Sequence, residues 1–299
     1  MEHAPPSQTK IPVPILRATR YVAATASPRI GMKKYWHVIN VGIQNNLTYR
    51  FNFLARTLFG LIPLMAVLFL WRTIYSTKSA DATVSGYTLA QMIFYYLLVT
   101  IVDAVTAVNE DDWQIAADIK DGNISQFLLK PVDYLWFRLC LFLSGRLTYM
   151  AVAFIPLTLF ILYLREYFVA PANWVTFSLF VVSLGLTALL QFFISYMMAM
   201  LAFWVLEVST FIFILYAFEY IASGHLFPLD ILPPTLERAL YFTPFPYQLY
   251  FPVGIYMGRT TGAELARGFG MQIFWVLFAY AAARFAWQRG IKKYAAVGG

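Results

Sequence analysis

The longest nearly uncharged stretch of this sequence runs from Tyr167 to Leu229, and it constrains the fold more than any other feature. Only Glu207 and Glu219 are charged within its 63 residues. That length is too great for one membrane helix of roughly 20 residues and suits two. Across the chain 60% of residues are apolar and 12% are charged, against about 45–50% and about 25% in a soluble domain. A single soluble core cannot bury this excess, so we expect an all-α integral membrane protein.

Other uncharged runs predict the remaining spans. Thr57–Trp71, Ala82–Val102, Leu147–Leu164 and Gly268–Ala283 each lack Asp, Glu, Lys and Arg. Extended to membrane length, the runs predict six transmembrane helices, at about 52–74, 86–108, 138–163, 174–196, 202–222 and 265–287.

The segment 223–262 is also apolar, but prolines interrupt it. Pro244, Pro246 and Pro252 each remove a helix hydrogen bond and clash with the preceding turn. Unpaired backbone facing lipid is too costly for a broken helix to cross the membrane there. We expect short interfacial or re-entrant helices, and a kinked seventh span is the alternative.

The distribution of Lys and Arg predicts the orientation. Fourteen of these residues lie in 1–50, 110–138 and the C-terminal tail, against five on the opposite side. The positive-inside rule therefore places both termini in the cytoplasm, which an even number of spans also requires. The net charge of +7 lies at membrane ends rather than on one face, which argues against a nucleic-acid partner.

Two segments precede the first span. Residues 1–32 read as a disordered cytoplasmic tail without a cleaved secretory signal. From Lys33 apolar residues recur at three- and four-residue spacing, which predicts an amphipathic helix over 33–50 along the inner membrane surface. Its apolar positions are Trp36, Ile39, Ile43 and Leu47.

The loop between the second and third spans predicts a short cytoplasmic helix over 110–122. Acidic residues cluster at its start, where the helix dipole favours them, and Gly122 suits its end. The residues alone leave two interpretations open. One is a solvated connection, and the other is a lever that a cytoplasmic protein grips.

Chemistry of other kinds is poorly supported. The sequence has no Gly-x4-Gly-Lys-Ser/Thr loop for a nucleotide, no Gly-x-Ser-x-Gly elbow, and no metal-ligand spacing among its three histidines. The ionisable residues near the spans are Asp103, Arg146, Glu207 and Glu219. Asp103 and Arg146 fall on adjacent spans, where they can pair. Interface anchoring or a structural pair is favoured for all four over a proton relay.

With these segments placed, the chain resembles the membrane permease of a type-2 ATP-binding-cassette exporter, in the branch related to daunorubicin-resistance permeases. Three stretches carry the likeness, and with the span pattern it covers about residues 33–299. They are Ile119–Pro131 after the second span, the segment from Phe227 to Pro252 with its Phe-Pro and Leu-Pro pairs, and the tail from Arg289 to Tyr294.

The resemblance implies roles for these segments. Residues 110–122 resemble the coupling helix that receives motion from a separate ATPase subunit, with candidate contacts at Glu110, Asp111, Asp112, Trp113, Ala116, Asp118, Lys120 and Gly122. Residues 33–50 resemble the interfacial connecting helix, and residues 223–256 the extracellular re-entrant helices. The resemblance also implies a second permease, different or identical, in a bacterial cytoplasmic (inner) membrane. ATP and Mg bind the partner subunit, so this chain is not an enzyme and binds no cofactor or metal.

Two functions from other classes remain. An ion-coupled transporter or channel works without an ATPase, and a neighbouring gene for an ATP-binding cassette would argue against it. A membrane enzyme of lipid or glycan metabolism needs a polar catalytic cluster, which the sequence does not present. The exported substrate is not indicated.

Overall fold

The computed structural model describes residues 28–79, 83–108, 111–205 and 207–297, and of residues 28–32, 111 and 295–297 it describes the backbone alone. The regular elements in these ranges are helical. In chain order they are α2 (Pro28–Thr48), α3 (Arg50–Ser76), α4 (Leu89–Thr106), α5 (Asp111–Lys120), α6 (Ile124–Leu128), α7 (Tyr134–Tyr163), η1 (Arg165–Tyr167), α8 (Trp174–Ala199), η2 (Met200–Phe203), α9 (Ser209–Ala222), η3 (Leu229–Ile231), α10 (Pro234–Leu240), η4 (Phe245–Tyr247), α11 (Tyr250–Tyr256) and α12 (Gly262–Val297), where η marks a 3-10 turn.

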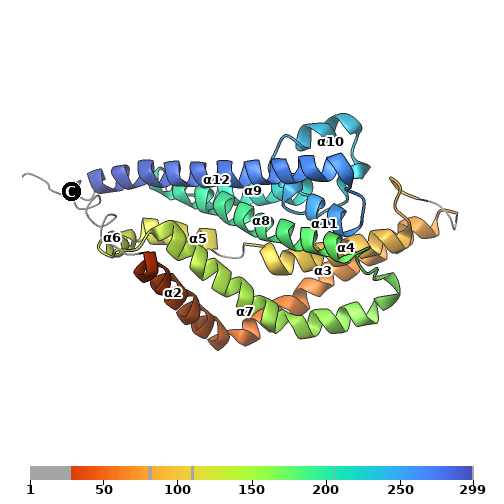
Figure 1. Ribbon diagram of the computed structural model, residues 1–299, viewed down its shortest axis with the longest axis horizontal. Coiled ribbons are helices and arrows are strands. Elements are labelled where there is room, and N and C mark those ends of the chain that lie inside the picture. The colour runs from red at the N-terminus through yellow and green to blue at the C-terminus, as the bar shows by residue number, and fades with distance from the viewer. Residues whose placement is uncertain (1–27, 80–82, 109–110, 206, 298–299) are drawn as a thin grey trace, which may run out of the picture.

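Five of these helices are long and apolar enough to cross a membrane: α3, α4, α7, α8 with its continuation η2, and α12. They extend along the long axis of the molecule, with α5, α6 and the C-terminal end of α12 at one end and α10 near the other (Figure 1). Each overlaps one predicted span, over 52–74, 86–108, 138–163, 174–196 or 265–287. The all-helical fold of an integral membrane protein is therefore confirmed.

The remaining predicted span, 202–222, is not one continuous helix. Its first residues belong to η2, the chain leaves helical geometry after Phe203, and α9 begins only at Ser209. The carboxylate of Glu207 accepts a hydrogen bond from the Ser209 amide at 3.1 Å, which satisfies a free donor at the new helix start. At 14 residues, α9 spans about 21 Å, less than the roughly 30 Å hydrocarbon core. The prediction of an unbroken helix over 202–222 is wrong, and six complete spans remain a prediction.

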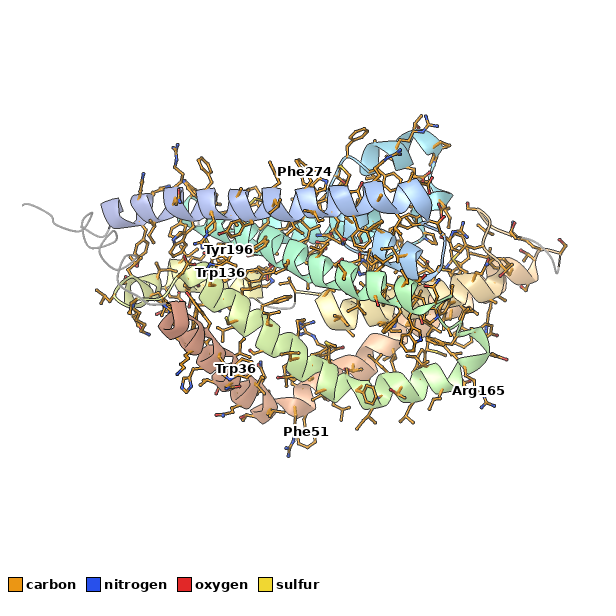
Figure 2. The ribbon with its side chains drawn as sticks, viewed as in Figure 1. Trp36, Phe51, Trp136, Arg165, Tyr196 and Phe274 are labelled. Atoms are coloured by element: carbon orange, nitrogen blue, oxygen red, sulfur yellow. The ribbon has the colours of Figure 1, made fainter. Side chains whose placement is uncertain are left out.

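The helix predicted over 33–50 corresponds to α2, and its place at the membrane surface stays a prediction. It begins at Pro28 rather than Lys33, so residues 28–32 are not part of a tail, while residues 1–27 lie outside the described residues. Its chain turns at Tyr49 into α3, and α2 packs along α7. A Cβ added at Gly42 would lie 2.3 Å from the Ser144 hydroxyl, so glycine permits this close approach. Trp36 on α2 is 64% exposed, and Phe51 lies at the corner between α2 and α3 (Figure 2).

The core of the bundle is built around α4 and α8. Met92 and Tyr95 on α4 and Phe192 and Tyr196 on α8 are at most 1% exposed. Figure 2 shows Tyr196 inside the bundle, whereas Phe274 lies on the outer face of α12 and is 52% exposed. Large exposed apolar side chains on the long helices are the surface expected to face lipid.

Residues 223–261 follow the broken path that their prolines predict. The elements are η3, α10, η4 and α11, none longer than seven residues. Pro246 lies in η4 and Pro252 in the first turn of α11, where a missing amide donor costs no helix hydrogen bond. A single helix through Pro244, Pro246 and Pro252 is not formed, so the alternative of a seventh span is wrong.

Hydrogen bonds and one cation hold this segment against the rest of the chain. The hydroxyls of Tyr87 and Tyr250 donate to the two oxygens of Asp230 at 2.7 and 2.6 Å. The guanidinium of Arg259 lies 3.8 Å from the centre of the Tyr87 ring and 3.7 Å from Asp230. Burial and then the Asp230 carboxylate raise the pKa of Tyr87, so its hydroxyl stays a donor at neutral pH.

The start of the segment reaches the middle of α4. Tyr95 donates to the carbonyl of Gly224 at 2.6 Å, and Tyr96 donates to that of Leu226 at 2.7 Å. Gly224 has φ +95°, and a Cβ there would lie 2.7 Å from the Tyr95 hydroxyl. Glycine therefore makes this sharp turn possible. The turn packs against the middle of α4, at Tyr95 and Tyr96.

Candidate functional site

The short helix α5 is buried on one side and open on the other. Ile115, Ala116 and Ile119 are at most 5% exposed, where α5 packs against α8 and η2. On the opposite side Trp113 is 42% exposed, and Ala117 and Lys120 are also exposed. An apolar stripe thus anchors α5 while a large aromatic side chain remains open.

Polar contacts tie α5 to the start of α7. The Asp118 carboxylate forms an ion pair with the Arg138 guanidinium and accepts a hydrogen bond from the Tyr134 hydroxyl at 2.7 Å. Arg138 is 5% exposed and also donates to the Tyr134 hydroxyl at 2.9 Å. Another Arg138 nitrogen lies 3.4 Å from the Gln114 carbonyl. A buried charge pair with these additional hydrogen bonds resists separation, because either partner alone would be left unpaired.

A further polar contact, between Asp112 and Tyr216, ties α5 to α9. Asp112 is 1% exposed, and its carboxylate accepts a 2.9 Å hydrogen bond from the Trp113 amide and another from the Tyr216 hydroxyl. Burial raises the pKa of Asp112, although both hydrogen bonds favour its charged form and act the other way. The contact bridges 104 residues of sequence, from α5 to the short helix α9.

The chain after α5 is fastened by α12 and α2. Gly122 has φ +77°, as expected for a glycine after a helix end, and its carbonyl accepts from the Tyr294 hydroxyl at 3.1 Å. Asp133 and Arg284 form an ion pair at 2.5 Å. Lys34 donates to the Pro131 carbonyl at 2.7 Å. Both ends of the described chain therefore meet the loop that carries α5 and α6.

The predicted coupling residues fall into distinct environments. Trp113 and Lys120 are exposed, Asp112 and Ala116 are buried within the chain, and Asp118 is occupied by Arg138. Glu110 and the side chain of Asp111 lie outside the described residues. The predicted set of contacts does not include the exposed Gln114 and Ala117 or the buried partners Tyr134, Arg138 and Tyr216. No pattern in the loop itself signals those partners, because they lie on other helices.

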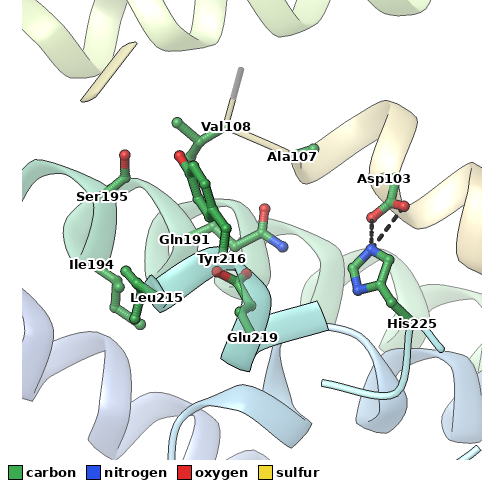
Figure 3. A pocket seen from close by; sticks show the side chains of 10 residues that line it. All are labelled: Asp103, Ala107, Val108, Gln191, Ile194, Ser195, Leu215, Tyr216, Glu219 and His225. Carbon is green, nitrogen blue, oxygen red and sulfur yellow. Dashed lines mark hydrogen bonds and ion pairs between the residues drawn. The ribbon is translucent and has the colours of Figure 1, made fainter. Parts of the chain in front are cut away.

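A cavity of about 170 Å³ lies between α4, α8, α9 and the turn after α9. Figure 3 shows the side chains that line it. Its apolar wall includes Ala107, Val108, Ile194 and Leu215. Its polar residues are Asp103, Gln191, Ser195, Tyr216, Glu219 and His225.

Two of the predicted intramembrane residues, Asp103 and Glu219, meet in this cavity, together with a histidine assigned from sequence to an outer loop. Nε2 of His225 lies 2.8 and 2.9 Å from the two oxygens of Asp103, and its Nδ1 lies 2.8 Å from the Ser223 hydroxyl (Figure 3). From the sequence Asp103 and Arg146 can pair, and the structure pairs Asp103 with His225. Because the turn at Gly224 brings His225 onto α4, no spacing in the sequence could signal it.

The other two predicted residues lie elsewhere. Arg146 is 6% exposed, with its guanidinium 5.2 Å from the centre of the Tyr149 ring. Glu207 is exposed in the break before α9 and binds the Ser209 amide there. Neither lines the cavity. The residues that do, besides Asp103 and Glu219, include Gln191 and Ser195 on α8, which the sequence analysis did not single out.

A comparison with protein families decides the identity of this arrangement. Residues 61–298 match the family described as ABC-2 family transporter protein. The chain belongs to the ABC-2 family. It is a multi-pass transmembrane permease of the ABC transporter class, a component of membrane transport rather than a catalytic one. No curated protein matches the sequence.

Family membership relates α5, the cavity and the proline-rich segment to membrane transport. An ABC-2 permease is the membrane part of an ABC exporter. The match covers α5, the cavity and the proline-rich segment together, so all three belong to the transport domain.

Proposed function

We propose that this chain is the membrane-spanning half of an ATP-driven exporter, with α5 as the coupling helix. A separate ATPase subunit binds ATP and Mg²⁺ and moves α5. A second permease, identical or different, completes the pathway through the membrane. The one-sided burial of α5 carries the proposal, because a lever must be firmly attached to the pore and open to its driver. Contacts to α7, α8 and α9 supply the attachment.

The ATPase binds the open side of α5, where Trp113, Ala117 and Lys120 are exposed. Tryptophan is one of the residue types enriched at the energetic hot spots of protein interfaces. Asp112 and Ala116, which the sequence suggested as contacts for the ATPase, are buried on the side of α5 that packs against the bundle, and they hold the helix in place. Among the charged candidates whose side chains the structure describes, Lys120 is exposed and can steer the partner.

In this proposal both termini and α5 are cytoplasmic in a bacterial inner membrane, and residues 223–256 form an outer cap with re-entrant helices. The excess of Lys and Arg in the termini and the 110–138 loop supports that orientation. So does the position of α5, α6 and the end of α12 at one end of the bundle (Figure 1). The stretch Ile119–Pro131 supports placement in the branch that resembles daunorubicin-resistance permeases.

Co-purification with the ATPase tests the proposal. Trp113→Ala removes the exposed aromatic group and keeps the Asp118–Arg138 and Asp112–Tyr216 contacts that hold α5 to the bundle, so the permease is expected to fold and insert normally. We expect at least a tenfold loss of ATPase binding at matched expression, from a hot spot of about 2 kcal/mol or more. The control is Trp174→Ala at the far end of α8, where the side chain is 83% exposed. Equal recovery of the ATPase with both variants would refute the proposal.

A second function, an ion-coupled transporter without an ATPase, draws support from the cavity. Asp103, His225 and Glu219 are ionisable groups between helices, and such groups often mark ion pathways. Transport by the purified permease in vesicles that contain no ATPase and no nucleotide would favour this function. Transport that requires both would favour the exporter.

A further inference from the structure

The cavity between α4, α8 and α9 contains more hydrogen-bond acceptors than its own donors satisfy. At about 170 Å³, it is smaller than the roughly 300–1,000 Å³ of pockets for whole drug-sized ligands. It therefore fits one polar group of a larger molecule. Figure 3 shows Gln191 between Tyr216 and the pair formed by His225 and Asp103, with Glu219 beside it.

Three acceptors in the cavity lack a partner among the described residues. Gln191 is 6% exposed, and its amide oxygen is buried without a hydrogen bond. Ser195 is 5% exposed, and its hydroxyl oxygen is likewise without one. The carboxylate of Glu219 has no hydrogen bond or ion pair in the part of the chain that the structure describes, and it lines the same cavity. Buried polar atoms are nearly always paired, so unpaired ones around a cavity point to a missing donor.

The charges around the cavity identify the donor as cationic. Both oxygens of Asp103 are committed to His225, and the Asp112 carboxylate is committed to Tyr216 and the Trp113 amide. His225 is the nearest group that can carry a positive charge, and it is paired with Asp103, so Glu219 has no ion pair of its own among the described residues. It lies in the last turn of α9 (Ser209–Ala222), where the helix carbonyl end also favours a positive charge. A carboxylate between membrane helices needs a counter-charge, because the surroundings solvate it poorly.

An organic cation fits these groups better than a metal ion. The described residues contain no group of three His, Cys, Asp or Glu side chains placed to hold a metal. A primary ammonium has three N–H donors, which matches the carboxylate of Glu219, the amide oxygen of Gln191 and the hydroxyl of Ser195. Val108, Ile194 and Leu215 line the apolar wall, where the methylene groups next to the ammonium can lie.

We propose that this cavity binds the primary ammonium group of an amphiphilic molecule, with Glu219 as its counter-ion and Gln191 and Ser195 as hydrogen-bond acceptors. Identifying that molecule as exported cargo rests on the proposed exporter function. The site also offers a route by which bound cargo can signal to the ATPase through α5. Tyr216 forms one wall of the cavity and donates to Asp112 on α5, so an occupied cavity lies one hydrogen bond from the coupling helix.

Ligand binding to the purified permease in a non-ionic detergent tests the site without any ATPase. The probe is decylammonium, and decanol is its uncharged counterpart of equal length. We expect decylammonium to raise the unfolding temperature of the wild type, and decanol to have no such effect. Glu219→Gln should weaken decylammonium binding at least tenfold. Glu264→Gln, on the exposed first turn of α12, is the matched control and should bind as the wild type does.

A second variant keeps the test decisive if Glu219→Gln fails to fold. Gln191→Met removes a buried unpaired acceptor at similar volume, so the unliganded permease should unfold at a higher temperature and bind decylammonium severalfold more weakly. Equal affinity of wild type and Glu219→Gln, unchanged affinity in Gln191→Met, or equally tight decanol binding would overturn the site. Failure to find an ATPase partner would refute the exporter and leave this site intact.

Discussion

The hydroxyl of Tyr216 on α9 donates a hydrogen bond to the buried carboxylate of Asp112 on α5. This bond joins the helix proposed to meet the ATPase with the helix that walls the polar cavity. Tyr216→Phe deletes the donor and leaves Asp112 with the Trp113 amide alone. We expect a loss of about 1–3 kcal/mol in stability, the cost of removing one partner from a buried polar group. Thermal unfolding in detergent measures it, with Tyr163→Phe, at a 75% exposed position, as the unaffected control.

A double-mutant comparison checks the cause. In an Asp112→Asn background the same Tyr216→Phe change should cost less, because a neutral amide is cheaper to leave unpaired than a carboxylate. Strictly additive losses would mean that the two side chains do not interact energetically.

The pH dependence of stability tests the burial of Asp112. Its pKa in the folded chain is raised above the ordinary 3.8 by burial, so the folded state binds this proton more tightly than the unfolded state. The stabilisation of the folded state by this proton is complete below pH 3.8, and it is lost as the pH rises through the raised pKa of Asp112. Asp112→Asn does not titrate and can still accept from Tyr216. We expect the wild type to lose stability relative to Asp112→Asn as the pH rises from about 4 to 7, so that the unfolding temperature of the variant rises relative to that of the wild type. A constant difference over that range would show that Asp112 is not desolvated.

Two glycines of α12 make a matched pair for testing the packing of α11, in the proline-rich segment 223–261, against α12. A Cβ added at Gly268 would lie 2.0 Å from the ring of Phe251 on α11, whereas at Gly270 nothing lies within 4 Å. Gly268→Ala must displace a buried ring, with an expected loss of about 1–3 kcal/mol. Gly270→Ala should gain roughly 0.5–1 kcal/mol from helix propensity. Thermal unfolding compares them, and equal effects would place Phe251 away from α12.

Cysteine labelling in intact cells tests the orientation. Ser79 and Thr235 are exposed near the end of the molecule opposite α5, and Ala117 is exposed on α5. A cysteine at either of the first two should react with a membrane-impermeant maleimide, and one at Ala117 should react only after the cells are opened. The native Cys140 is buried and gives the background. Labelling of Ala117→Cys in intact cells would reverse the topology.

The fold was largely predictable because its main signal is local. Runs of apolar residues specify the long helices, and Gly122 and the prolines of 223–261 mark ends and breaks that the structure reproduces. The exception is 202–222, where uniform hydropathy conceals a break. There the signal is a single carboxylate, Glu207, whose contact with the Ser209 amide begins a new helix.

The site was less predictable because its contacts cross long sequence separations. His225 reaches Asp103 over 122 residues, and Tyr216 reaches Asp112 over 104. The family resemblance made Asp118 a candidate contact for the ATPase, but the structure pairs it with the buried Arg138. A variant that reverses the charge of Asp118 would therefore disturb the attachment of α5 as well as any interface. Periodicity shows which residues share a face, but it does not show which face a neighbouring helix covers.

The most direct test of the coupling role is photo-crosslinking from position 113 in living cells. A photoreactive phenylalanine derivative replaces Trp113 in one strain and the exposed Trp174, at the other end of the bundle, in another. The account predicts an adduct from position 113 with a protein that contains a Gly-x4-Gly-Lys-Ser/Thr nucleotide loop, and none from position 174. No such adduct from position 113, at matched expression and insertion, would contradict the assignment of α5 as the coupling helix.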